Sequence, residues 1–125
     1  MQNRTLITLI VLIAGIILMA SCTDKYITKP YITPPPPGYQ YSLTTDVQPV
    51  FNDKCILCHK IGSIPPDLTS GNSYASLTSM NLINTKNPTG SILYKKMNGG
   101  SMATYCTQQD ADLVLQWIMQ GAKNN

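Results

Sequence analysis

The chain has 125 residues, a formal net charge of +3 and only 12% charged residues. This length allows one small domain, and the lack of a dense Lys/Arg cluster argues against a nucleic-acid partner. All 6 acidic residues are Asp and there is 1 His, so the paired groups that hydrolytic acid/base chemistry needs are poorly supplied. We therefore expect neither an ordinary enzyme nor a small-molecule substrate.

The first residues carry an export pattern. Arg4 precedes an uncharged apolar run, Leu6–Ala20, which is shorter than the roughly 20 residues that a membrane-spanning helix needs. The following Leu18-Met19-Ala20-Ser21-Cys22 resembles the lipobox of bacterial lipoproteins. The resemblance implies that residues 1–21 are a signal peptide and that Cys22 is lipidated, which would anchor the protein to a membrane of the bacterial cell envelope, facing the periplasm. An uncleaved short anchor is the alternative.

Residues 22–40 are rich in proline. They include Pro30 and the run Pro34–Pro37, followed by Gly38, and they show no apolar period of 2 or 3.6. Proline runs favour extended polyproline II geometry, so we expect a tether that holds a domain away from a membrane. A ligand for a proline-binding module is the other interpretation.

Residues 41–125 then form the folded domain, which is small for a core made of protein alone. Its cysteines do not make a disulfide framework. Cys55 and Cys58 stand close together, Cys106 stands by itself, and Cys22 is assigned to the lipid. This pattern favours a cofactor as the missing source of stability.

The sequence Cys55-Ile56-Leu57-Cys58-His59 matches the C-x-x-C-H signature of covalent c-type haem attachment. Thiols at i and i+3 share one face of a helical turn, where each can bond to one haem vinyl group while the imidazole reaches the iron. A thioredoxin-like redox pair needs a βαβ context, and a structural zinc needs a second pair of ligands. The chain offers neither, and a plain core histidine would not explain why His59 directly follows the pair.

The motif and its flanks carry a family resemblance. Residues 46–55 lead into the motif, and residues 115–122 close the domain. Together they resemble small, class I-like c-type cytochromes with one haem, of the kind found in membrane-anchored proteins of Bacteroidetes and Planctomycetes. The resemblance covers residues 41–125. It implies an all-α bundle of about three to five helices around one covalently bound haem, with a methionine as the usual second iron ligand.

Apolar spacing independently predicts helices. Val47, Val50 and Phe51 indicate a first helix capped by Thr44 or Thr45, with Pro49 in its first turn. Short helices are expected near residues 73–78 and 91–97, the latter with Met97 on its apolar face. A capping box at Thr107-x-x-Asp110, an apolar stripe with Trp117 beside it, and Gly121 as a stop predict the last helix.

The second iron ligand must come from a methionine, since no second His exists. Met102 lies in the permissive segment Gly99-Gly100-Ser101-Met102-Ala103, at the place where related cytochromes carry their ligand, with Ala103 replacing a frequent proline. Met97, Met80 and a missing protein ligand remain alternatives, and Met119 belongs to the core or the surface.

Three weaker features complete the pattern. The turn Ile64-Pro65-Pro66 is a candidate source of a carbonyl that holds the histidine ring, or simply a turn. Cys106 is expected to be a small buried residue, with intermolecular pairing or thiol chemistry as the alternative. Four lysines near the motif and the methionine loop form either a rim that steers an acidic partner or a solvated face; they are Lys54, Lys60, Lys95 and Lys96.

Together these features predict a membrane-tethered carrier of single electrons between redox partner proteins of the cell envelope, with iron held by His59 and Met102. Two alternatives stay open. One is a five-coordinate haem protein that binds a gas or peroxide, and the other is a haem-containing structural subunit of a respiratory complex.

Overall fold

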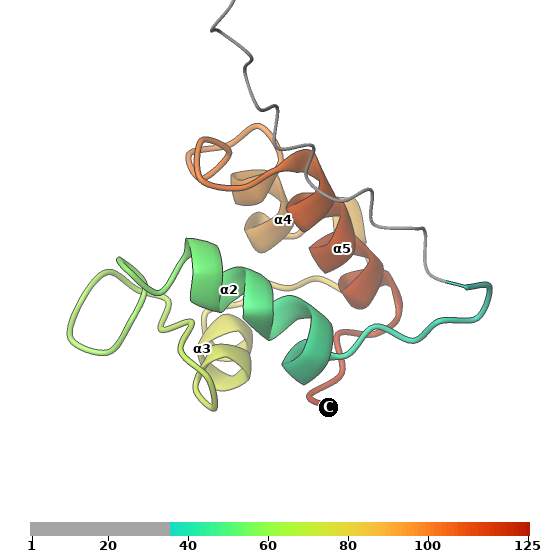
Figure 1. Cartoon of the computed structure of the whole chain (residues 1–125), viewed down its shortest axis with the longest axis horizontal. Helices are drawn as coiled ribbons and strands as arrows, with labels where there is room; N and C mark the ends of the chain where they lie inside the picture. Colours follow the sequence, from blue (N-terminus) through green and yellow to red (C-terminus); the bar gives the residue numbers. More distant parts are fainter. Residues whose placement is uncertain (1–35) are drawn as a thin grey trace, which may run out of the picture. The chain divides into compact units, whose positions relative to one another are not determined.

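The computed structural model describes residues 36–125. In chain order its elements are the π-helical turn η1 (Leu43–Val47), α2 (Gln48–Lys54), α3 (Ser73–Ser79), the 3-10 turn η2 (Pro88–Gly90), α4 (Ile92–Met97) and α5 (Gln108–Met119). No strand occurs within residues 36–125 (Figure 1), so the expected all-α class is confirmed at this level. No helix in this range combines the length and apolar character needed to cross a membrane. The predictions for the signal peptide, Cys22 and the tether as far as residue 35 lie outside the described residues.

Helix α5 supplies the centre of the core. Ala111, Val114, Trp117 and Ile118 are completely buried, and their spacing places them on one face of the helix. This face packs in one apolar cluster with side chains from the other elements, because each short helix is too small to bury its own apolar stripe. Those partners include Val47, Phe51, Leu77, Leu93 and Met97.

The predicted ends of the last helix are confirmed. The Thr107 hydroxyl accepts a hydrogen bond from the Asp110 backbone N–H at 3.2 Å, and the Asp110 carboxylate accepts one from the Thr107 N–H at 2.8 Å. This reciprocal pair satisfies two backbone donors that a helix start leaves free. Beyond the helix, Gly121 has a φ of +99°, the left-handed conformation that ends helices and favours glycine.

The predicted cap of the first helix is wrong. Neither Thr44 nor Thr45 begins it; instead Ser42 is the N-cap of η1, and its hydroxyl accepts from the Thr45 N–H at 3.4 Å. The start lies earlier because Leu43 and Val47, four residues apart, are both buried on the core side of the turn. Pro49 does lie in the first turn of α2, as expected.

The two short helices are confirmed to within one residue at either end. α3 buries Leu77, and α4 buries Leu93 and Met97, so the expected placement of Met97 on an apolar face is also confirmed. Helix α4 packs against α5, and η1 contacts both α2 and α5 (Figure 1). This arrangement leaves the long segments after α2 and after α4 outside the helices.

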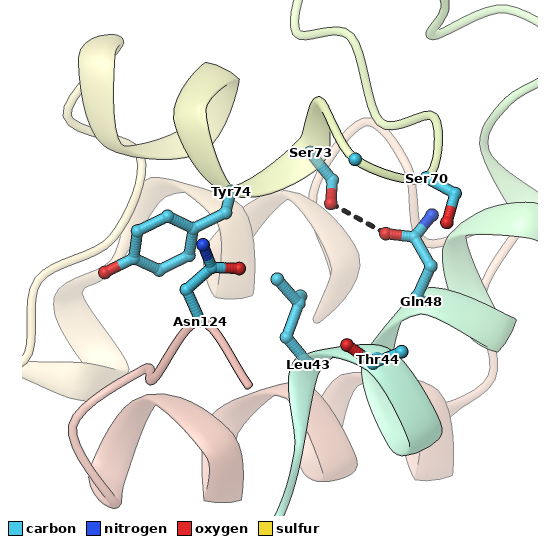
Figure 2. Close-up of a pocket in the computed structure, with 8 residues that line it drawn as sticks. Leu43, Thr44, Gln48, Ser70, Ser73, Tyr74 and Asn124 are labelled. Atoms are coloured by element: carbon cyan, nitrogen blue, oxygen red, sulfur yellow. Dashed lines mark hydrogen bonds between the residues drawn. The ribbon is translucent and has the colours of Figure 1, made fainter.

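Gln48 joins α2 to α3 through a buried polar contact. Its amide nitrogen donates to the Leu68 carbonyl at 2.9 Å and to the Asn52 side chain at 2.8 Å. Its amide oxygen accepts from the Ser73 hydroxyl at 2.7 Å, the bond drawn in Figure 2. Both Gln48 and Ser73 are buried, so these groups depend on one another for hydrogen bonding.

We expect Gln48→Ala to lower the free energy of unfolding by about 2–4 kcal/mol, because it leaves the buried Ser73 hydroxyl and Leu68 carbonyl without this partner. Urea unfolding followed by circular dichroism measures the change. Gln116→Ala, at an exposed position on α5, is the matched control and should stay within about 0.5 kcal/mol of the wild type. Equal effects of the two substitutions would contradict the assigned role of Gln48.

Candidate functional site

The two cysteines and the histidine of the motif lie on one turn directly after α2. The Cys55 N–H donates to the Phe51 carbonyl at 2.8 Å, which continues the helical pattern. The Cys55 carbonyl then accepts from the N–H groups of Cys58, at 3.1 Å, and His59, at 2.9 Å. Cys55 is half-buried against the core and Cys58 is exposed. The expected grouping of these three residues on a single turn is confirmed.

The His59 ring is held from one side by the backbone. Its Nδ1 lies 3.1 Å from the Ile64 carbonyl oxygen, so the Ile64-Pro65-Pro66 turn does supply the predicted carbonyl. Because a carbonyl oxygen only accepts hydrogen bonds, Nδ1 must carry the proton in this contact. In the neutral ring, Nε2 then keeps its lone pair, which is the form that binds a metal.

Backbone contacts also hold the loop that contains Met102. The Met102 N–H donates to the Lys96 carbonyl at 2.9 Å, and its own carbonyl accepts from the Tyr105 N–H at 3.0 Å. Gly100 passes so close to the Lys95 carbonyl that a Cβ there would clash with it. Of the four methionines considered as ligands, Met102 is half-buried, Met97 is in the core, and Met80 and Met119 are exposed.

We expect Gly100→Ala to lower the free energy of unfolding by about 1–3 kcal/mol, because the added methyl group has to displace the Lys95 backbone. Urea unfolding again provides the measurement. Ser101→Ala, at the exposed neighbouring position, serves as the control with an effect within about 0.5 kcal/mol. A neutral Gly100→Ala variant would show that this close backbone approach does not exist in solution.

Cys106 influences the first thiol of the motif, a relation that sequence reasoning missed. Cys106 is among the groups that raise the pKa of the Cys55 thiol, and the charges of Asp110 and Lys54 act on the pKa of Cys106. No local pattern could have revealed this relation, since the two cysteines are far apart in the sequence and belong to different segments.

Both thiols of this pair are held in their neutral form. Burial raises the pKa of the Cys55 thiol to about 12, and the neighbouring Cys106 acts in the same direction. Burial also raises the pKa of the Cys106 thiol, and the carboxylate of Asp110 adds to that effect. A buried thiol is stable as the neutral group because the low-polarity surroundings penalise the thiolate.

We expect iodoacetamide to modify Cys55 at least tenfold more slowly in the folded, haem-free protein than in the protein unfolded by guanidinium at the same pH of about 8.5. The reason is that the thiolate is the reactive species, and a pKa of about 12 leaves little of it at that pH. Peptide mass spectrometry at several times gives the rate at Cys55. A folded-state rate equal to the unfolded one would contradict the burial of this thiol.

Large apolar side chains are exposed on the segment that contains Cys55 and on the segment that contains Cys106. The exposed fractions are 83% for Leu57, 82% for Ile61, 58% for Ile64 and 65% for Tyr105. Soluble domains rarely gather exposed apolar side chains without a ligand or a partner to cover them. Of the four predicted lysines, Lys54 pairs with Asp53, and Lys60, Lys95 and Lys96 are exposed.

A separate small pocket lies between η1 and α3. Leu43, Gln48, Ser73, Tyr74 and Asn124 are among the residues that line its volume of about 100 Å³ (Figure 2). Every buried side-chain nitrogen and oxygen within residues 36–125 has a hydrogen-bond partner, so no buried polar side-chain atom there is left unpaired. No group of three or more His, Cys or Asp side chains able to hold a metal ion occurs in the same part of the chain. The motif turn, with Cys55, Cys58 and His59, is therefore the stronger candidate site.

Comparisons of the chain with protein-family models, curated proteins and solved structures found no match.

Proposed function

We propose that residues 41–125 carry one covalently attached haem c and transfer single electrons between redox partner proteins of the bacterial cell envelope. In this proposal, Cys55 and Cys58 bind the haem through thioether bonds, and His59 and Met102 are the two iron ligands. The bound haem iron supplies the one-electron redox chemistry. Cys22 carries the lipid anchor, and the residues that follow it hold the domain away from the membrane.

The observation that carries the proposal is the contact of His59 with the Ile64 carbonyl next to the two motif cysteines. A carbonyl that takes the Nδ1 proton orients the ring and leaves Nε2 as a metal ligand. The same turn carries the exposed Cys58 thiol, which is open to bonding with a group outside the core. A motif turn that holds two thiols and an oriented imidazole together fits a covalently attached haem.

The apolar side chains beside the motif also favour this group. Leu57, Ile61 and Ile64 are exposed on the segment that follows α2, and Tyr105 is exposed on the segment that contains Met102. A porphyrin is large, flat and apolar, so binding it would remove such side chains from water at about 25 cal/mol per Å². The same contribution would add to a core built from very short helices. The cytochrome c-like bundle is the finer fold that this proposal implies.

Met102 decides between electron transfer and ligand binding. Its backbone is fixed by the Lys96 carbonyl and its side chain is half-buried, whereas Met80 and Met119 are exposed. A methionine sulfur as the second iron ligand would favour ferrous iron, which suits an electron carrier. The exposed Lys60, Lys95 and Lys96 would favour an acidic partner surface in a weak, transient complex.

The test is to produce the full chain with a bacterial haem-attachment system and to record its visible and near-infrared spectra. We expect a c-type spectrum, haem that stays attached after denaturation, and a methionine-to-iron band in the ferric protein that Met102→Ala abolishes. Met80→Ala is the matched control and should retain that band. Absence of covalent haem would overturn the whole proposal. Retention of the band in Met102→Ala would overturn the assignment of Met102, and tight carbon monoxide binding by the ferrous wild type would favour the five-coordinate alternative.

A further inference from the structure

The pair Asn98-Gly99 lies at the end of α4 and begins the loop that contains Met102. It is the one place in the chain where an asparagine is followed by a glycine. Asn98 is the C-cap of α4, and both residues are exposed to solvent. Gly99 has a φ of +78°, and no other part of the domain crowds its Cα. Neither residue takes part in the proposed function.

We propose that Asn98 is a site of spontaneous deamidation. A base removes the proton of the Gly99 N–H, and the backbone nitrogen attacks Cγ of the Asn98 side chain. The new C–N bond closes a succinimide ring, while the bond from Cγ to Nδ2 breaks and Nδ2 takes up a proton and leaves as ammonia. A water molecule then opens the ring at either carbonyl, which gives aspartate or isoaspartate at this position. One water is consumed for each ammonia released, and no oxidant or reductant is needed.

The Gly99 nitrogen is accessible for this attack. Of the residues that the structure describes, none accepts a hydrogen bond from the Gly99 N–H. Glycine also has no side chain to crowd its own nitrogen. The nucleophile and the amide belong to neighbouring residues, so rotation about the bonds of Asn98 is enough to bring them together. Asn98 therefore has both the neighbour and the exposure that ring closure requires.

Three other asparagines of the domain lack this combination. The N–H that follows Asn72 donates to the Thr69 carbonyl at 3.0 Å. The N–H that follows Asn81 donates to the Leu77 carbonyl at 2.9 Å. Asn84 is followed by a threonine, whose branched side chain crowds the nitrogen that would have to attack. These positions should deamidate much more slowly than Asn98.

The Tyr94 hydroxyl holds the amide group that has to move. Asn98 Nδ2 donates to the Tyr94 hydroxyl at 2.6 Å, and the Asn98 N–H donates to the Tyr94 carbonyl at 2.8 Å. The side-chain bond directs the amide back along α4, whereas ring closure brings Cγ to the nitrogen of Gly99. The amide has to leave the hydroxyl before it reacts. Tyr94 is thus a positioning residue that slows the reaction.

The isoaspartate product alters the backbone where the Met102 loop is held. In isoaspartate the main chain runs through the former side chain, so a carbon is added before Gly99. The next residue, Gly100, passes too close to the Lys95 carbonyl to accept even a Cβ. In the same short loop, the Met102 N–H bonds to the Lys96 carbonyl at 2.9 Å, and a longer backbone weakens that bond. That this loosens an iron ligand rests on the proposed function, but the deamidation itself does not.

The first arm of the test follows the full chain at about pH 8 and about 37 °C, with trypsin digestion after increasing times. Residues 97–123 form one tryptic peptide, in which Asn98 is the one asparagine. Residues 61–86 form another, which contains Asn72, Asn81 and Asn84 and serves as the internal control. Deamidation replaces an amino group by a hydroxyl, and mass spectrometry of the two peptides gives both rates. Neither peptide contains the motif cysteines, so the measurement does not depend on haem.

We expect the rate at Asn98 to exceed the rate of the control peptide by about tenfold or more. Tyr94→Phe should raise the rate at Asn98 by about threefold, because the amide loses its hydroxyl partner. Tyr74→Phe, at a tyrosine that is also half-buried, is the matched control and should leave the rate unchanged. A rate at Asn98 no faster than that of the control peptide would overturn the proposal. Equal rates in Tyr94→Phe and the wild type would overturn the role of Tyr94.

The second arm measures the Met102 loop in protein kept under these conditions until most of Asn98 has reacted. Hydrogen–deuterium exchange of residues 97–106 is expected to be about threefold or more faster than in fresh protein. Asn98→Asp, kept for the same time, has the new charge without the added carbon and should stay close to fresh protein. Unchanged exchange in the reacted wild type would overturn the effect on the loop, and equal exchange in Asn98→Asp would overturn the role of the added carbon.

The same samples with attached haem distinguish this inference from the proposed function. The methionine-to-iron band of the ferric protein should fall in proportion to the isoaspartate formed at Asn98. An unchanged band in fully converted protein would overturn the effect on the iron ligand. A chain that deamidates at Asn98 in the first arm but never attaches haem would overturn the proposed function and leave the deamidation site in place.

Discussion

The double variant Cys55→Ser/Cys58→Ser is expected to carry no covalently attached haem when it is produced beside a wild-type chain that does. The two sulfurs are the only attachment points that the motif turn offers, and a serine hydroxyl does not form the thioether. Mass spectrometry of the denatured protein measures the attached haem, with a loss of at least 100-fold expected.

Cys106→Ser is the matched control for this experiment. It removes a third cysteine of the same domain, one that is not in the motif, and should retain covalent haem in reducing conditions. A single-cysteine variant such as Cys58→Ser should keep one bond at reduced yield. Covalent haem in the double variant would show that attachment occurs elsewhere in the chain. Loss of haem in Cys106→Ser under reducing conditions would show that the Cys106 thiol is also needed for haem attachment.

Trp117→Ala is expected to have the largest effect on folding, with a loss of about 3–5 kcal/mol in the free energy of unfolding. The indole is completely buried in the α5 face of the core, and its Nε1 donates to the Lys123 carbonyl at 3.0 Å. Truncation leaves a cavity and removes that hydrogen bond. Because small domains have only about 5–15 kcal/mol of net stability, this loss would remove a large share of it.

Circular dichroism during urea unfolding measures this loss. Met119→Ala is the control, since Met119 is 58% exposed on the same helix, and its effect should stay within about 0.5 kcal/mol. A Trp117→Ala variant as stable as the control would contradict the central position of α5 in the core.

The parts of the fold that sequence predicted well are those set by neighbouring residues. The capping box of Thr107 and Asp110 and the stop at Gly121 are local patterns, and both are confirmed. The position of Cys55, Cys58 and His59 on one turn also follows from the spacing of these residues in the sequence. The predicted start of the first helix was wrong because Ser42, Thr44 and Thr45 are all residue types that cap helices well. The burial of Leu43 decides among them in favour of Ser42.

The parts of the site that sequence missed depend on contacts between distant segments. The influence of Cys106 on the pKa of the Cys55 thiol links two segments that are far apart in the sequence, which leaves no trace in either local pattern. The support of Met102 by the Lys96 carbonyl likewise depends on how the loop folds back over α4. The Ile64 carbonyl was found because it follows His59 closely and is followed by two prolines, a pattern that marks a turn.

The chain has 1 Trp, and that residue lies at the centre of the helical core. Its fluorescence therefore reports one position, without contributions from other indoles and without an added dye. In the haem-free protein, a blue-shifted emission from the folded state should move to longer wavelength as water reaches the ring. The natural sequence thus contains its own optical probe of α5, suited to stopped-flow measurements on very dilute samples.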